Sequence, residues 1–398
     1  MASNPKIFTL HGKGLKLDIK ADIEPHLKGV DPTLIEEIHF GGNTLGVDAS
    51  TALAEFLSKA TNIKVADFAD IFTGRLISEI PQALSAICDA LIDKTSLVEI
   101  NLSDNAFGGR SVDPIVPFLT KNRSFQILKL NNNGLGPAGG SVIANALLES
   151  AKLSKKEGKP SNLKTVICGR NRLENGSAPI WADAFAEHGG LVEVRMPQNG
   201  IRMEGITALA RGLSKCPSLE HVDLQDNTFT ADGGLEGIEA WTEALQSWPD
   251  LRFLNLSDCV LSVDGEIPIL LTALAEGSNP KLHTLQLQNN NLDTQTYSLL
   301  AQNITTGLAK LMSLELQWNE GIEEDDEHLE TIALSLKQRG GKLIATEDDE
   351  EEEEEEPEEE KVEEEKEEEQ KTEEEETKAA NDKAADDLAD LLGKVNIK

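Results

Sequence analysis

A repeated leucine-rich pattern limits what this chain can fold into more than any other feature of its sequence. The pattern reads apolar-x-x-apolar-x-apolar-x-x-Asn-x-apolar, and its clearest copy runs from Phe125 through Asn133 to Leu135. Nine copies lie within residues 34–322, mostly about 28 to 38 residues apart. Repeats of this length stack so that each contacts its neighbours and all share one continuous core. The pattern therefore predicts a leucine-rich-repeat solenoid of the α/β class.

Each copy predicts one short strand followed by a turn. Alternate side chains of a strand point to opposite faces, so the apolar-x-apolar step directs its apolar side chains into the core. The asparagine that follows can bond backbone groups where neither helix nor sheet supplies partners. A tenth copy, beginning at Ile63, keeps the register but lacks the asparagine. The nine full copies begin at Ile35, Leu97, Phe125, Leu163, Leu191, Leu219, Leu251, Leu282 and Leu311, and the copy at Leu251 has Cys259 in the asparagine position.

The segments between the strands have helical patterns, as in Ala138–Leu148 and Gly205–Leu213. We therefore expect a horseshoe with parallel strands on the concave side and helices on the convex side. Residues 1–33 are predicted to form an N-terminal cap and residues 323–345 a C-terminal cap around the solenoid of residues 34–322.

Residues 346–398 differ in composition from everything before them. Between Glu347 and Lys378, 23 Asp or Glu residues stand against 4 Lys, a net charge of −19 out of −34 for the chain. Such a segment repels itself and is predicted to be a disordered acidic tail. It serves either solubility or attraction to a basic partner. Apolar residues at helical spacing from Leu388 to Val395 predict a short terminal helix, whose partner the sequence does not reveal.

Several function classes are excluded by what the sequence lacks. It has no phosphate-binding GxxxxGK[ST] loop, no HExxH zinc motif and no GxSxG nucleophile motif, so we expect neither an enzyme on its own nor a metal site. A strongly acidic chain would repel nucleic acid. No apolar stretch is long enough to span a membrane, and unpaired cysteines suit a reducing compartment. These features favour a protein of the reducing cytosol or nucleus that binds another protein, and we expect it to be a monomer.

The position before each ladder asparagine is predicted to lie at the edge where strands turn toward helices. We call these positions the rim row. The rim row comprises Gly42, Asp70, Asp104, Asn132, Arg170, Gln198, Asp226, Asp258, Asn289 and Trp318. A solvated turn explains their polarity but not the tryptophan. We predict partner binding by the charged members Asp70, Asp104, Arg170, Asp226 and Asp258.

The degenerate second repeat places an arginine beside this row. After Ile71 the chain reads Phe72-Thr73-Gly74-Arg75, and Gly74 permits an unusual turn. Arginine suits planar, bidentate contacts with phosphate or carboxylate, although an arginine on a loop is most often an exposed surface charge. The cluster Lys152, Lys155, Lys156 and Lys159 is expected to form a solvated loop with at most a weak contact role.

Several loops closely resemble those of the Ran GTPase-activating protein family, in its fungal form. The strings that carry the resemblance are Asp70-Ile71-Phe72-Thr73-Gly74-Arg75, Leu102-Ser103-Asp104-Asn105-Ala106-Phe107-Gly108, Asn132-Asn133-Gly134-Leu135-Gly136-Pro137, Cys168-Gly169-Arg170-Asn171-Arg172-Leu173-Glu174-Asn175-Gly176 and Leu224-Gln225-Asp226-Asn227-Thr228-Phe229-Thr230. The similarity covers residues 7–340 and includes an acidic tail. The further folded C-terminal domain of the animal members has no counterpart here, so docking at the nuclear pore is not supported.

The resemblance implies a cytoplasmic activator of Ran that keeps Ran-GTP low and so gives nuclear transport its direction. Ran would bind GTP and Mg²⁺, the chain would need no cofactor of its own, and a Ran-binding protein would join a ternary complex. In this family the activator fixes the catalytic Gln of the GTPase without inserting an arginine finger. Asn132 matches the residue that contacts this Gln, and Arg75 matches an arginine whose loss impairs activation. The alternatives are a leucine-rich-repeat inhibitor, although such inhibitors are richer in cysteine, or a structural scaffold.

Overall fold

The computed structural model describes residues 6–322 and 326–346. The chain divides into two compact units, Met1–Leu343 and Ile344–Lys398. All of the predicted repeats belong to the first unit. The acidic segment Glu347–Lys378 and the terminal helix predicted after it lie outside the described residues, and the cap boundaries stay a prediction.

Most of the strands form one sheet in the order of the chain, and each neighbouring pair from β1 to β13 is parallel. Each central residue faces its counterpart one repeat away, as Leu128 faces both Ile100 and Val166. The sheet contains β1 (Ile7–Thr9), β3 (Glu37–His39), β5 (Val65–Asp67), β6 (Glu99–Asn101), β7 (Ile127–Lys129), β8 (Thr165–Ile167), β9 (Glu193–Arg195), β10 (His221–Asp223), β11 (Phe253–Asn255), β12 (Thr284–Gln286), β13 (Ser313–Glu315) and β14 (Lys342–Ile344). A separate pair joins β2 (Lys16–Leu17) to β4 (Thr44–Leu45).

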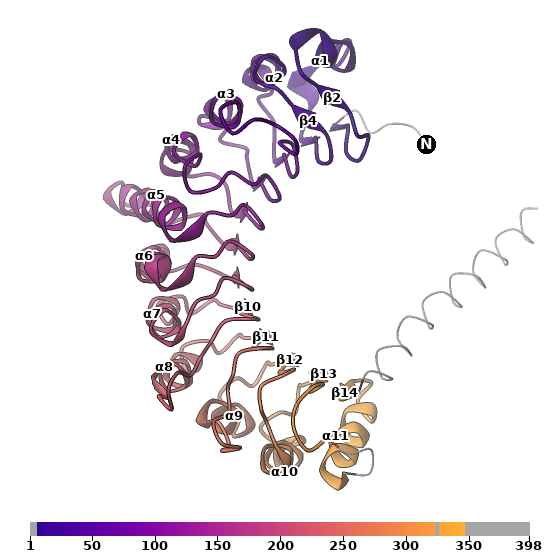
Figure 1. The fold of residues 1–398 in the computed structure, drawn as a ribbon, viewed down its shortest axis with the longest axis vertical. Coiled ribbons are helices and arrows are strands. Elements are labelled where there is room, and N and C mark those ends of the chain that lie inside the picture. The colour runs from indigo at the N-terminus through magenta and orange to yellow at the C-terminus, as the bar shows by residue number, and fades with distance from the viewer. Residues whose placement is uncertain (1–5, 323–325, 347–398) are drawn as a thin grey trace, which may run out of the picture. The chain divides into compact units, whose positions relative to one another are not determined.

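Helices follow the strands one repeat at a time and line the face opposite the sheet (Figure 1). They are α1 (Lys20–Leu27), α2 (Val47–Lys59), α3 (Ile80–Leu91), α4 (Val116–Lys121), α5 (Gly136–Lys156), α6 (Glu174–His188), α7 (Met203–Leu213), α8 (Glu236–Leu245), α9 (Ile269–Ala275), α10 (Thr294–Asn303) and α11 (Glu327–Lys337), with 3-10 turns η1 (Pro32–Leu34) and η2 (Asp113–Ile115). Helix α7 shows why they pack: Ile206, Leu209 and Leu213 recur at helical spacing and are buried. The predicted solenoid is confirmed.

The N-terminal segment already has the repeat architecture. Strand β1 pairs in parallel with β3, and α1 packs on α2. Residues 6–30 therefore extend the sheet and the helix layer by one further unit, and they cover the edge strand that the first full repeat would otherwise leave open.

A buried asparagine ladder joins the repeats. The Asn133 amide donates to the backbone oxygens of Leu102 and Leu130, both at 3.0 Å, and its Oδ1 accepts from the Asn105 N–H at 3.0 Å. One side chain thus satisfies three backbone groups in two adjacent repeats. The asparagines that repeat this arrangement are Asn43, Asn105, Asn171, Asn199, Asn227, Asn290 and Asn319.

Cys259 occupies a ladder position in place of asparagine. Its Sγ lies 3.4 Å from the Leu224 oxygen and 3.3 Å from the Ser257 oxygen, so the thiol keeps the direction of the missing amide as a weaker donor. All four cysteines are unpaired and buried. Burial raises the pKa of each thiol, which makes them core residues rather than reactive ones.

The structure corrects one prediction about the lysine cluster. Lys152, Lys155 and Lys156 lie on α5, and only Lys159 follows the helix. The insert in this repeat therefore lengthens a helix rather than forming a solvated loop. The lengthened helix is stabilised by packing, because α5 buries residues as far along as Ala151 and Ser154.

Candidate functional site

The rim row is a line of left-handed residues. Every member has a positive φ, between 47° at Asp70 and 74° at Gly42. Glycine adopts this conformation freely, Asp and Asn tolerate it, and other residues are strained by it. Backbone geometry therefore accounts for the many Asp and Asn residues in the row. It does not account for Arg170, Gln198 or Trp318, with φ of 57°, 54° and 59°.

The backbone of the rim row is fixed from one repeat to the next. The Asp104 N–H donates to the Asn131 oxygen at 2.8 Å, the Asn132 N–H to the Gly169 oxygen at 2.9 Å, and the Arg170 N–H to the Pro197 oxygen at 2.9 Å. Each row residue is followed by a ladder position, so its Cα is held on both sides. The exposed side chains of the row thus project from a rigid backbone.

Asn132 has a restrained, exposed side chain. Its Nδ2 donates to Asp104 Oδ1 at 3.0 Å, across one repeat. The other amide hydrogen and Oδ1 are left facing solvent, which gives one donor and one acceptor side by side. Asn133, the next residue, is buried in the ladder. Two adjacent asparagines thus have opposite environments.

Carboxylates gather farther along the same row. Partial burial raises the pKa of Asp226, and the nearby charge of Asp258 raises it further. Asp258 in turn accepts from Asn289 Nδ2 at 2.6 Å. The predicted partner-binding residues Asp104, Asp226 and Asp258 therefore lie on one edge of the solenoid, with Asp70 and Arg170 in the same row. Their roles stay a prediction.

Arg75 is buried, whereas an arginine on a loop is most often an exposed surface charge. Its side chain is only 8% exposed and forms an ion pair with Asp18, with NH1 2.5 Å from Oδ1. Nε donates to Thr44 Oγ1 at 2.6 Å, and NH2 donates to the Thr44 oxygen at 2.9 Å. The guanidinium also lowers the pKa of Asp18. Arg75 thus ties the loop after β5 to the β2–β4 pair, because its planar fork matches these acceptors.

The sheet face carries a polar cluster that sequence reasoning missed. His221 and Phe253, on adjacent strands, stack with ring centroids 3.9 Å apart and an angle of 8°. Burial, together with the nearby charge of Arg195, lowers the pKa of His221 to about 4. Burial also raises the pKa of Asp223. The signal was present in the sequence. Asp223 and Arg195 occupy the middle of an apolar-x-apolar step, and His221 and Phe253 come directly before such a step.

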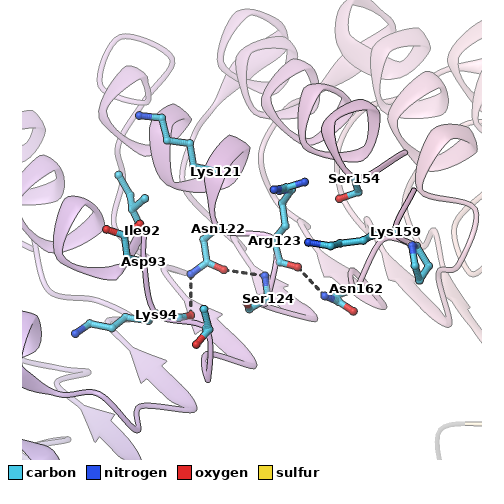
Figure 2. A pocket seen from close by; sticks show the side chains of 12 residues that line it. Ile92, Asp93, Lys94, Lys121, Asn122, Arg123, Ser124, Ser154, Lys159 and Asn162 are labelled. Atoms are coloured by element: carbon cyan, nitrogen blue, oxygen red, sulfur yellow. Dashed lines mark hydrogen bonds between the residues drawn. The ribbon is translucent and has the colours of Figure 1, made fainter. Parts of the chain in front are cut away.

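A cavity of about 470 Å³ lies at the opposite edge, where the strands begin. It is lined by loops before β6, β7 and β8 and includes Lys94, Lys121, Arg123 and Lys159. Figure 2 shows Asn122 bonded to the Lys94 oxygen, and Asn162 bonded to the Arg123 oxygen, which fix these loops to one another. None of the predicted site residues lines it.

The described ranges, 6–322 and 326–346, contain neither a metal site nor a membrane-spanning helix. Within them, no cluster of three or more His, Cys, Asp or Glu side chains is arranged to hold a metal ion. No helix there has the length and apolar character needed to cross a membrane.

The chain was compared with known proteins. A leucine-rich-repeat family model matches residues 121–144 and 215–236. Ran GTPase-activating protein 1 of Saccharomyces cerevisiae is 36% identical over 336 residues, covering 82% of this chain and 81% of the relative. Ran GTPase-activating protein 1 of Xenopus laevis is 44% identical over 198 residues, covering 49% of this chain and 34% of the relative. Among solved structures, an internalin from Listeria monocytogenes covers 79% of this chain and 81% of its own, with 17% identity and a TM-score of 0.39.

The fold and the rim row define a leucine-rich-repeat protein with a rigid polar edge. The similarity to the yeast protein extends over most of both chains, and it identifies the family: the chain belongs to the Ran GTPase-activating proteins. The resemblance carried by the loop sequences is thereby confirmed. The frog relative is much longer than the match, which covers about a third of it.

Proposed function

We propose that this chain activates GTP hydrolysis by the small GTPase Ran. The main support is membership of the family together with a rigid rim that displays Asn132. GTP and Mg²⁺ belong to Ran in this proposal, and the chain contributes protein surface alone. Its place is the cytoplasm, where activation keeps Ran-GTP low, and a Ran-binding protein completes a ternary complex.

In the proposed mechanism Asn132 orients the catalytic Gln of Ran. That Gln positions the attacking water in GTPases of this kind. One Asn132 N–H is occupied by Asp104, so the remaining N–H can donate to the side-chain oxygen of the Gln, and Oδ1 can accept from its NH₂ group. A contact made mainly in the transition state raises the maximal rate rather than the affinity. The fixed backbone matters because small misplacements of a positioning group are costly.

Arg75 acts indirectly in this proposal. Its guanidinium is directed at Asp18 and Thr44, which leaves it poorly placed to reach the γ-phosphate of a bound partner. It holds the loop after β5 in place instead. The acidic row members Asp70, Asp104, Asp226 and Asp258, with Arg170 between them, would bind the partner surface, and their field would speed encounter with a basic surface.

The test is single-turnover hydrolysis of GTP bound to Ran, with and without catalytic amounts of the full chain. We expect acceleration by orders of magnitude, and no hydrolysis when the chain is given GTP without Ran. A panel of other small GTPases serves as the control for specificity. Equal rates with and without the chain would contradict the proposal and favour an inhibitor or a scaffold, which would bind a partner without accelerating hydrolysis.

A further inference from the structure

Exposed apolar side chains concentrate at the edge that carries the rim row. Of the ten large apolar residues that are exposed among the described residues, six lie in connections from a strand to the following helix. These six are Ile19, Leu76, Ile77, Leu235, Val260 and Trp318. Single exposed apolar residues are ordinary, but their concentration on one edge is typical of a surface that another molecule covers.

Leu76 and Ile77 are the most exposed members of this set. Their exposed fractions are 67% and 64%, and they are consecutive. They lie in the long connection between β5 and α3, directly after Arg75. We call Leu76 and Ile77 the apolar tip. Neither side chain belongs to the core, so core packing in the described part of the molecule does not explain why both residues are apolar.

The loop that carries the apolar tip is ordered by local bonds. Thr73 Oγ1 donates to Asp70 Oδ1 at 2.5 Å, which links the loop to the rim row. The Leu76 N–H donates to Glu79 Oε2 at 3.2 Å, and Gly74 provides the turn with φ of 77°. A fixed loop loses little conformational entropy when a partner covers it.

Arg75 attaches the loop to the neighbouring repeat through Thr44 and to the N-terminal segment through Asp18. Its ion pair with Asp18 joins the apolar tip to the segment before α1, where Ile19 is 51% exposed. Exposed apolar residues thus follow both members of the ion pair in sequence, Ile19 after Asp18 and Leu76 after Arg75. The ion pair holds together two short segments that each present an apolar side chain.

We infer that the apolar tip is a docking element that an apolar part of the GTP-bound Ran surface covers in the activating complex, with Arg75 as its positioning residue. The inference rests on the proposed function and names a contact for the same edge. It also gives a reason for the arginine in this loop: its removal frees the loop and weakens docking without touching the reacting atoms. Apolar contacts in rigid, central places carry much of the free energy of protein association.

The first experiment compares the double variant Leu76→Ser/Ile77→Ser with the wild-type full chain in Ran-stimulated GTP hydrolysis. We expect KM for GTP-bound Ran to rise about tenfold or more, because the serines remove the apolar surface that Ran would bury on binding. The maximal rate should stay within about twofold. The matched control is Leu334→Ser on α11, whose side chain is 53% exposed on a helix, and it should leave KM unchanged.

The second experiment separates docking from structural support. Arg75→Ala alone should raise KM, and adding it to the double variant should raise KM little more, because both act through one loop. Melting temperature should change little in the double variant, since both side chains of the apolar tip are largely exposed and lie outside the core. Hydrogen exchange of residues 73–78 should slow when GTP-bound Ran is added at saturation.

The outcomes are distinct. A wild-type chain that does not accelerate Ran overturns the proposed function and this inference with it. A wild-type chain that does accelerate Ran, with an unchanged KM for the double variant and no slowing of exchange in residues 73–78, overturns the docking element alone. Independent, multiplicative effects of Arg75→Ala and the double variant overturn the positioning role of Arg75.

Discussion

The asparagine ladder and the rim row are one residue apart in every repeat that contains both, yet they differ in burial and in their effect on stability. The ladder amides are mostly buried and each bonds at least three backbone groups, as Asn133 does. The rim residues are left-handed, and most of their side chains face solvent, as Asn132 does. The ladder stabilises the solenoid, whereas the rim row costs stability at several positions. One step along the chain therefore separates a polar side chain that bonds the backbone from one that is available to a partner.

The largest effect is expected from breaking the ladder. In Asn171→Ala, the Asn133 N–H and the oxygens of Leu130 and Gly169 lose a partner. Only the Asn133 N–H is left unpaired, because the Leu130 oxygen keeps Asn133 Nδ2 and the Gly169 oxygen keeps the Asn132 N–H as donors. An unpaired buried polar group costs roughly 1 to 3 kcal/mol, so we expect a loss of about 2 kcal/mol in the free energy of unfolding. Urea denaturation measures it. A loss below about 0.5 kcal/mol would mean that the ladder is not a main support.

A smaller effect of opposite sign is expected at Arg170. This residue is left-handed, with φ of 57°, and asparagine tolerates that conformation better than arginine. Arg170→Asn should therefore raise the free energy of unfolding by about 1 kcal/mol while weakening the interaction with Ran. Thermal denaturation and KM are measured on the same preparation. A gain in stability with unchanged KM would assign Arg170 to the surface rather than to the interface.

The smallest effect concerns the charge of Asp226. Its folded pKa is raised, so the folded state favours the protonated form relative to the unfolded state. The resulting stability is present at pH below the ordinary value of 3.8 and is lost as pH rises through the folded pKa. Asp226→Asn should therefore be slightly more stable than wild type at pH 7 and equal to it at about pH 3.5. The side chain is exposed and screened by solvent, so we expect a few tenths of a kcal/mol at most. Denaturation curves at both pH values test the sign.

Much of the fold could be predicted because the repeat pattern encodes it directly. The positions of Leu128, Leu130 and Asn133 specify a strand, a core face and a turn, and stacking follows from their recurrence. The length of α5 could not be read in this way, because Lys152–Lys156 has the polarity of a loop and becomes helical through packing of Ala151 and Ser154.

The candidate site could be predicted only in part. The rim row follows from its fixed offset from the ladder, but its left-handed backbone does not, although the many Asp and Asn residues are the sign of it. The burial of Arg75 depends on Asp18 and Thr44, which are 57 and 31 residues away in sequence. A single sequence contains no local signal for such a contact. Leu76 and Ile77 can be read in the sequence as two apolar residues. Their exposure at the tip of a loop is known only from the structure.

The central claim is that Asn132 acts on Ran while its neighbour Asn133 holds the fold. The most direct test measures single-turnover GTP hydrolysis by Ran at saturating activator, together with the melting temperature, for Asn132→Ala and Asn133→Ala. We predict that Asn132→Ala lowers the maximal rate by about 10² to 10³ with only a small loss of melting temperature, which comes from alanine at a φ of 52°. Asn133→Ala lowers the melting temperature much more and leaves the maximal rate of the folded protein nearly normal. A near-normal maximal rate for Asn132→Ala, or a loss of melting temperature as large as that of Asn133→Ala, would contradict the account.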